Sequence, residues 1–309
     1  MLAYDLVLWL LVFGLALSCI SLRDTLAAVI AYTVYGLVLA LVWLQLAAPD
    51  AALTEAAIGA LAGVLLLRAA IRLRPSEALA ERVQPGRWMR AGVALGCTLV
   101  TGGLAWVVLT LPEPAPTLAP QVLAHQTSTD LGNSVTAVLL AFRAIDTLLE
   151  AVVLIFALIA VWSLTPDKAW GGVPGSARCA MPPRPYLARL LPPVGLVVAL
   201  YVFWIGADLP GGKFQAGALL AAMWVLTMMA GLSSPPPVSR RALRLLLVAG
   251  TLVFLSIGML GIPTAGAFLA YPEGWAKPLI LTIEAAAMVS IGVTLGLLVI
   301  GYPEPGHDA

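Results

Sequence analysis

Six carboxylic acids lie inside or at the ends of long apolar segments, and they are the residues of this sequence best suited to do chemistry. An ionised carboxylate in a membrane is costly unless it meets a partner, a cavity or water, so such acids mark paths for protons or cations. A partly buried carboxyl group can also exchange protons near neutral pH. The alternative for each acid is that it caps a helix or joins subunits. The candidates are Asp50, Glu55, Asp146, Glu150, Asp208 and Glu284.

Residues 133–164 hold two of these acids together with an arginine. On a continuous helix Arg143, Asp146 and Glu150 stand at i, i+3 and i+7 and share one face. Glu150 opens a charge-free apolar segment, which favours a functional role for its carboxylate. Arg143 is a charge-pair candidate for Asp146. The alternative is that this pair lies at the membrane interface and Glu150 only borders it.

Composition is typical of polytopic membrane proteins. The chain has 309 residues, of which 61% are hydrophobic and 11% charged, and its net charge of +1 gives no indication of nucleic-acid binding. Its three cysteines, Cys19, Cys97 and Cys179, are far apart and indicate neither a disulfide framework nor a metal site. We predict an all-α fold with about nine transmembrane helices and a short external amphipathic helix. The spans are expected at 3–22, 26–47, 51–73, 91–111, 145–164, 188–205, 214–232, 243–261 and 278–301.

Basic residues indicate the orientation of these spans. All but three of the 17 Lys and Arg residues fall in loops on one side, and the exceptions are Arg143, Lys213 and Lys277. Loops rich in Lys and Arg face the cytoplasm. The sequence therefore predicts an external N-terminus, a cytoplasmic C-terminus, and a place for all six acids in the outer half of the membrane.

The third span begins with a helix-breaking pair. Pro49 and Asp50 end the second span, and the Asp50 carboxylate can cap the third. Capping does not explain Glu55, which lies about 7.5 Å deeper along a helix. Three arginines close this span and are expected to extend to the cytoplasmic headgroups: Arg68, Arg72 and Arg74. A polar, Arg-rich linker follows at 75–90, and a proline-rich external cover precedes residue 130.

A sharp turn is expected between the sixth and seventh spans. The Pro-Gly-Gly sequence at 210–212 predicts it, and the small residues Gly212, Ala216 and Gly217 allow helix backbones to approach closely. The segment GADLPGGK is not a phosphate-binding loop, because Phe214 stands where Ser or Thr is required. No lysine lies inside any predicted span.

Four segments resemble known families. Residues 49–67 (PDAALTEAAIGALAGVLLL) resemble the proline-aspartate…threonine-glutamate helix of the small D-type subunits of membrane-bound hydrogenases. They also resemble the corresponding part of the large A-type subunits of Mrp-type cation/proton antiporters. Residues 133–162 resemble the next segment of those proteins, and residues 201–219 and 282–299 look like the four-helix B-type subunits of Mrp antiporters.

The resemblance implies a fusion of three pieces. Residues 1–90 would be a D-like segment of three helices, 91–170 an E-like segment of two, and 171–309 a B-like module of four. The B-like turn departs from the family pattern at Asp208 and at Lys213, where a small residue is usual. The long antiporter-like subunits with intramembrane lysines are absent from this chain, so the resemblance implies an accessory subunit.

The implied function is that of an accessory membrane subunit in a multisubunit Mrp-type antiporter of the bacterial or archaeal cytoplasmic membrane. It would contribute carboxylates to an ion path and helices to assembly, without enzyme activity, cofactor or bound metal. Its partners would be other membrane subunits, the bilayer, protons and, as a candidate, Na⁺, but no nucleic acid. Two alternatives stay open: the same module in a redox-driven complex (a membrane-bound hydrogenase or complex I relative), and a non-conducting bridge between pumping subunits.

Overall fold

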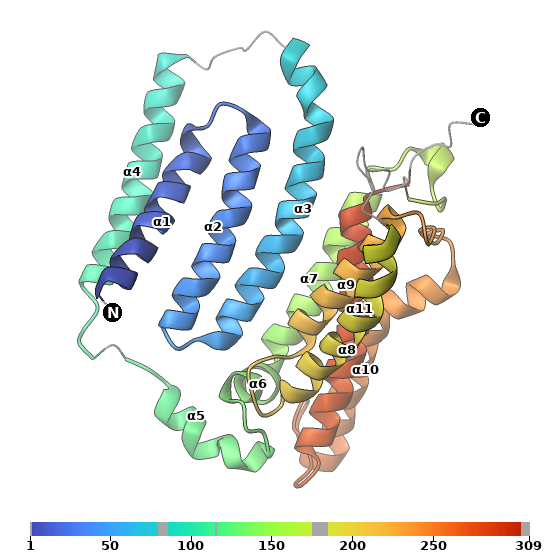
Figure 1. Ribbon diagram of the computed structural model, residues 1–309. Helices are drawn as coiled ribbons and strands as arrows, with labels where there is room; N and C mark the ends of the chain where they lie inside the picture. The colour runs from blue at the N-terminus through green and yellow to red at the C-terminus, as the bar shows by residue number, and fades with distance from the viewer. Residues whose placement is uncertain (1, 80–85, 115, 175–184, 304–309) are drawn as a thin grey trace.

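The computed structural model describes residues 2–79, 86–114, 116–174 and 185–303 (Figure 1). Cys179 and part of the expected Arg-rich linker at 75–90 lie outside these residues. The regular elements of the described residues are all helices, as predicted, with short 3₁₀ turns at Thr127–Thr129 and Asp167–Ala169 and one isolated β-bridge between Pro174 and Pro303. Its α-helices are α1 (Leu2–Ser21), α2 (Thr25–Gln45), α3 (Pro49–Leu79), α4 (Arg87–Leu109), α5 (Ala119–Gln126), α6 (Ser134–Ala137), α7 (Ala144–Trp162), α8 (Pro185–Ile205), α9 (Lys213–Met229), α10 (Arg241–Ala265) and α11 (Ala276–Ile300).

Nine of the described helices correspond to the nine predicted spans. Eight are long and apolar enough to cross a membrane, and α9 is apolar but shorter, at 17 residues. The greatest difference is at the end of α3, which continues to Leu79 through part of the expected Arg-rich linker. The proline-rich segment before residue 130 contains the eight-residue helix α5, which corresponds to the predicted short helix outside the spans. Helix α1 begins and α11 ends at opposite ends of the helices (Figure 1), as an odd number of crossings requires.

The helices form two groups that meet along α3. Helices α1 to α4 stand on one side of the molecule and α7 to α11 on the other (Figure 1). Helix α3 packs against α2 within its own group and against α9 and α11 of the other. Helix α11 is the centre of the second group and contacts α7, α8, α9 and α10. By contrast, no residue of α4 is buried within the described chain.

Glycines let the helices around α11 approach closely, as predicted for Gly217. A Cβ atom on Gly217 would lie 3.0 Å from the backbone oxygen of Met288 in α11. The turn between α8 and α9 depends on glycine for a second reason. Gly211 and Gly212 have φ values of 156° and 126°, a region that residues with a side chain rarely adopt. The predicted sharp turn is therefore confirmed.

The helix before α7 is interrupted. Asn133 caps α6 by accepting a hydrogen bond from the Val135 N–H at 2.9 Å. A π-helical turn (Val138–Phe142) follows and ends at Arg143, whose φ of −130° breaks the helix. Such π-turns occur frequently at functional sites. The prediction that Arg143, Asp146 and Glu150 share the face of one continuous helix is wrong, because Arg143 lies in the break.

Candidate functional site

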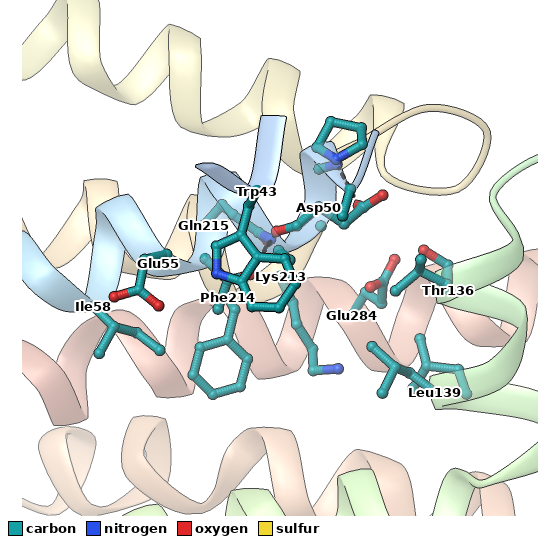
Figure 2. A pocket seen from close by; sticks show the side chains of 18 of the residues that line it. Trp43, Asp50, Glu55, Ile58, Thr136, Leu139, Lys213, Phe214, Gln215 and Glu284 are labelled. Atoms are coloured by element: carbon teal, nitrogen blue, oxygen red, sulfur yellow. Dashed lines mark hydrogen bonds between the residues drawn. The ribbon is translucent and has the colours of Figure 1, made fainter. Parts of the chain in front are cut away.

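A cavity of about 660 Å³ lies where the two groups of helices meet. Its walls come from the α2–α3 turn, the start of α3, the interrupted segment before α7, the first residues of α9, and α11. Figure 2 shows the side chains that line it. Four of the six predicted acids are among them, although they are up to 234 residues apart in the sequence. The charged residues of the lining are Asp50, Glu55, Glu150, Lys213 and Glu284.

Asp50 joins three parts of the chain. It is the second residue of α3, and its Oδ1 accepts hydrogen bonds from the Gly211 N–H at 3.1 Å and from Asn133 Nδ2 at 3.2 Å. Asn133 Nδ2 also donates to the carbonyl of Leu209 at 3.0 Å. Charge-assisted hydrogen bonds of this kind are among the stronger ones in proteins. The Asp50 carboxylate therefore holds α3, α6 and the α8–α9 turn together, a role beyond the predicted helix cap.

Glu284 is held at the amino end of α9. It is 3% exposed, and its carboxylate accepts a hydrogen bond from the backbone N–H of Lys213, the first residue of α9. A helix N-terminus stabilises a negative charge through its free N–H groups and its dipole. The second carboxylate oxygen, Oε2, is buried and has no hydrogen-bond partner in the described chain. One oxygen of Glu284 is thus fixed and the other is available.

Lys213 is the site residue that sequence reasoning missed. It was expected in the external turn, outside every span, but it is the first residue of α9 and only 5% exposed. Its ammonium group is attracted to Glu284 on α11 and to Glu150 on α7. The prediction that no lysine lies inside a helix of the bundle is therefore wrong, because Lys213 is the first residue of α9 and Lys277 the second residue of α11. The signal for Lys213 in the sequence was its position between the Gly-Gly turn and the small residues of a closely packed helix.

Two acids of the cavity, Glu55 and Glu150, are not held by hydrogen bonds within the described chain, and we call them the open acids. Neither carboxylate receives a hydrogen bond from any residue that the structure describes. Glu55 lies beside the close approach of Gly36 and Gly59 that joins α2 to α3. Glu150 is exposed on the surface of α7 in the isolated chain. These two acids are free to bind an ion or to meet a partner, whereas Asp50 and Glu284 are fixed by the fold.

The structure places the other two acids outside the cavity. Asp146 Oδ2 lies 2.6 Å from Arg143 Nε, and both side chains are largely exposed beside a separate hollow. Asp208 forms an ion pair with Lys277, with the ammonium 2.7 and 2.8 Å from its two oxygens. The hydrogen bond from Lys277 lowers the pKa of Asp208, and the Gly132 N–H adds to this effect. Both acids thus have local basic partners.

Beyond the cavity, the contact between α3 and α9 is apolar. Thr54 and Gln215 line both the cavity and this contact, and Gln215 Nε2 donates to Thr54 Oγ1 at 2.8 Å. The remaining residues around this second space, of about 150 Å³, are apolar side chains. They are Ala57, Ile58, Leu61, Ala62, Leu65, Phe214, Ala218 and Leu295. We call this contact the apolar seam.

The far end of the seam is closed by Arg68. Its guanidinium donates hydrogen bonds to the backbone carbonyls of Val299 and Ile300, at the carboxyl end of α11. A cation is favourable at a helix C-terminus, where carbonyl groups lack partners within the helix. The prediction that Arg68 extends to the headgroups is therefore wrong, because it joins α3 to α11 instead.

Comparisons with known proteins assign each end of the chain to a protein family. Residues 10–76 match the MbhD family (the D-type subunit of MBH), and residues 185–302 match the domain related to the MnhB subunit of Na⁺/H⁺ antiporters. The chain is an MnhB-type domain fused to an MbhD-like segment. The D-like and B-like resemblances of the sequence are thereby confirmed, and the E-like assignment of 91–170 stays a prediction. The acidic cavity lies between the two matched regions, with Glu150 in the residues that separate them.

Longer antiporter proteins contain similar sequences. The chain is 28% identical over 231 residues to the probable A/B-type subunit of a K⁺/H⁺ antiporter from Rhizobium meliloti, covering 63% of this chain and 23% of that protein. It is 29% identical over 168 residues to the A-type subunit of a Na⁺/H⁺ antiporter from Bacillus subtilis, covering 53% and 20%. The chain thus matches no more than a quarter of the length of these relatives.

Two solved structures share the fold. The MnhB-type chain matches a chain of the Mrp complex from Dietzia sp. DQ12-45-1b with a TM-score of 0.72 and 22% identity, over 98% of this chain and 35% of that one. It also matches a chain of the membrane-bound sulfane sulfur reductase, an archaeal respiratory membrane complex. There the TM-score is 0.54 and the identity 23%, over 68% of this chain and 95% of that one.

Proposed function

We propose that this MnhB-type chain is an accessory membrane subunit of a multisubunit Mrp-type cation/proton antiporter, and that its cavity is part of the ion path. The observation that carries the proposal is the meeting of four carboxylates from α3, α7 and α11 in one cavity. Acids gathered in a cavity within a membrane are the usual ligands of protons and cations in transport. The antiporter relatives from Rhizobium meliloti and Bacillus subtilis support the same assignment.

The arrangement supports an ion path that opens on one side of the membrane. Asp50 and Glu284 are fixed by hydrogen bonds, and they would keep the cavity in shape and negatively charged. Glu55 and Glu150 are open and would exchange protons and cations. The apolar seam would prevent an ion from continuing along α3 and α9, because an ion in apolar surroundings loses its hydration without compensation. An ion would therefore leave sideways, past the exposed Glu150, toward another protein of the complex.

The positive-inside pattern supports an opening toward the outside of a bacterial or archaeal cytoplasmic membrane. The open acids would then meet cations and protons from that side. Na⁺ and K⁺ are the candidate cations, because the relatives are named for them.

Two alternatives have a specific basis. The fold shared with a chain of the sulfane sulfur reductase supports the same module in a redox-driven complex. A non-conducting bridge is supported by the hydrogen bonds of Asp50 and Arg68, which join the two groups of helices. The proteins that copurify with the chain distinguish the first alternative, because redox complexes contain iron–sulfur or other redox proteins. Transport by variants distinguishes the second.

The test is Glu150→Gln in the assembled complex, with cation-dependent proton exchange measured in vesicles by a pH-sensitive dye. We expect a loss of more than about tenfold in exchange rate with normal yield of the complex. Asp146→Asn is the matched control, since Asp146 lies on the same helix but outside the cavity, and it should retain exchange. Normal exchange by Glu150→Gln would favour the bridge.

Glu55→Gln, alone and combined with Glu150→Gln, tests whether the two open acids serve one path. Two acids that serve one path should be non-additive, so the double variant should lose little more than the worse single variant. Independent, multiplicative losses would indicate two separate paths.

A further inference from the structure

Lys213 brings a positive charge into the cavity that the proposed path must accommodate. It is the one cation among the described residues that line the cavity. In the view of Figure 2 its side chain extends into the cavity, with Phe214 on one side and Glu284 and Leu139 on the other. A buried ammonium group is costly unless carboxylates compensate its charge. Glu284 and Glu150 provide this compensation from α11 and α7.

The ammonium group is nevertheless not in direct contact with either acid. Within the described chain it forms no ion pair at contact distance, unlike Lys277 with Asp208 or Arg143 with Asp146. The lysine side chain has four rotatable methylene groups and ends in a compact charge, so it can change position without moving the helix. Among the described residues, no ion pair at contact distance therefore has to break for the ammonium group to move away from the two acids.

The unpartnered oxygen of Glu284 is an independent indication of a ligand. Glu284 is 3% exposed and its Oε2 has no hydrogen-bond donor in the described chain. A buried carboxylate oxygen normally has a partner, because leaving it without one costs free energy. The groups that face it and bear charge are Lys213 and, across the cavity, Asp50, Glu55 and Glu150. A monovalent cation would complete its coordination.

We propose that the Lys213 ammonium is a tethered competitor for a monovalent-cation site formed by Glu150 and Glu284. This inference rests on the proposed function. Lysine and cation carry the same charge and are attracted to the same two carboxylates, so an entering cation must displace the ammonium group. The competition weakens cation binding and speeds release.

Lys213→Gln tests the competition in the assembled complex. We expect the half-saturating concentrations of Na⁺ and K⁺ for proton exchange in vesicles to fall by about tenfold, the scale expected when a unit charge several ångströms from a partly buried site is removed. Lys213→Ala should lower the half-saturating concentrations in the same way, and it excludes an effect of the glutamine amide. Lys277→Gln is the matched control, since Lys277 is paired with Asp208 outside the cavity, and its half-saturating concentrations should not change.

A second measurement uses the unaltered complex. If Na⁺ displaces the ammonium group, acetylation of Lys213 by a small amine-reactive reagent should be faster in NaCl than in choline chloride, whereas acetylation of Lys277 should not differ. Mass spectrometry of the two peptides provides the comparison. Equal acetylation of Lys213 in both salts would overturn the proposal even if neither Lys213 variant assembles.

Other outcomes distinguish failure of the competitor role of Lys213 from failure of the ion path through the cavity. Unchanged or higher half-saturating concentrations in Lys213→Gln, or loss of all exchange with normal assembly, would overturn the competitor role. If Glu150→Gln also abolishes exchange, the ion path stands and only the role of Lys213 falls. If Glu150→Gln has no effect, the ion path itself fails.

Discussion

The two ends of the contact between α3 and the second group of helices are built differently. At one end, Asp50, Asn133 and Gly211 connect three segments by hydrogen bonds beside a charged cavity. At the other end, the contact is apolar up to Arg68, which donates to the last carbonyls of α11. Both ends join α3 to the second group of helices. Only the first has room and charge for an ion.

This difference shows that the hydrogen bonds joining the helices of the described chain do not involve the open acids Glu55 and Glu150. Arg68 donates hydrogen bonds to the last backbone carbonyls of α11 at one end, and Asp50 accepts hydrogen bonds from Gly211 and Asn133 at the other. Glu55 and Glu150 make no hydrogen bond in the described chain and so contribute little to the junction. Their presence favours a role in binding over a role in assembly.

The largest effect is expected from introducing a carboxylate into the apolar seam and comparing it with a carboxylate introduced into the acidic cavity. Ala218 is 6% exposed and lines the apolar seam. Ala218→Asp should lower the free energy of unfolding by at least ~3 kcal/mol, because a buried carboxylate without a partner must lose its hydration. The loss would appear as poor yield and a lower melting temperature of the chain in detergent.

Val135→Asp is the control, because it introduces the same carboxylate into the acidic cavity instead of the apolar seam. Val135 lines the acidic cavity and is 44% exposed, so the new carboxylate keeps contact with water. We expect a change below ~1 kcal/mol. Equal tolerance of the two substitutions would show that the seam is hydrated and that the proposed barrier does not exist.

Asp50→Ala tests the hydrogen-bonded end. It removes the acceptor of the Gly211 N–H and of Asn133 Nδ2, and leaving such donors without a partner costs ~1–3 kcal/mol. We expect a lower melting temperature and faster proteolytic cleavage between the two groups of helices. Asp50→Asn keeps one acceptor oxygen and should lose less. A variant as stable as the original chain would mean that Arg68 and the apolar seam hold the groups together without Asp50.

The smallest effect is expected at Asp208, outside the cavity. Lys277 lowers the pKa of Asp208, so their pairing stabilises the fold above the ordinary pKa of aspartate, near ~4, and the gain is lost as the pH falls through the lowered value. Because Asp208 is half exposed, the contribution should stay below ~1 kcal/mol. The difference in free energy of unfolding between the original chain and Lys277→Gln should therefore be fully present at about pH 6 and should vanish in strong acid. Thermal melting at a series of pH values measures it. A pH-independent difference would show that Lys277 acts by packing.

The helices of this protein could be predicted from its sequence because each apolar run must form its own hydrogen bonds in lipid. Length and composition therefore determined the number of spans and, within a few residues, where they begin and end. The acids stood out for the same reason, since a carboxylate in an apolar segment is costly. The sequence also indicated the Gly-Gly turn and the MbhD-like and MnhB-type segments.

Only the tertiary structure decided which charged residues meet. Asp50, Glu150, Lys213 and Glu284 are on different helices, and nothing in the local pattern of each helix determines how the helices pack. Helix periodicity grouped Glu150 with Arg143 and Asp146, but the break at Arg143 takes that residue out of α7. Arg143 and Asp146 pair beside a separate hollow, whereas Glu150 lines the cavity. Lys213 was read as a turn residue because it follows two glycines. Its burial results from the close packing of α9 against α11, which brings Glu284 to the amino end of α9.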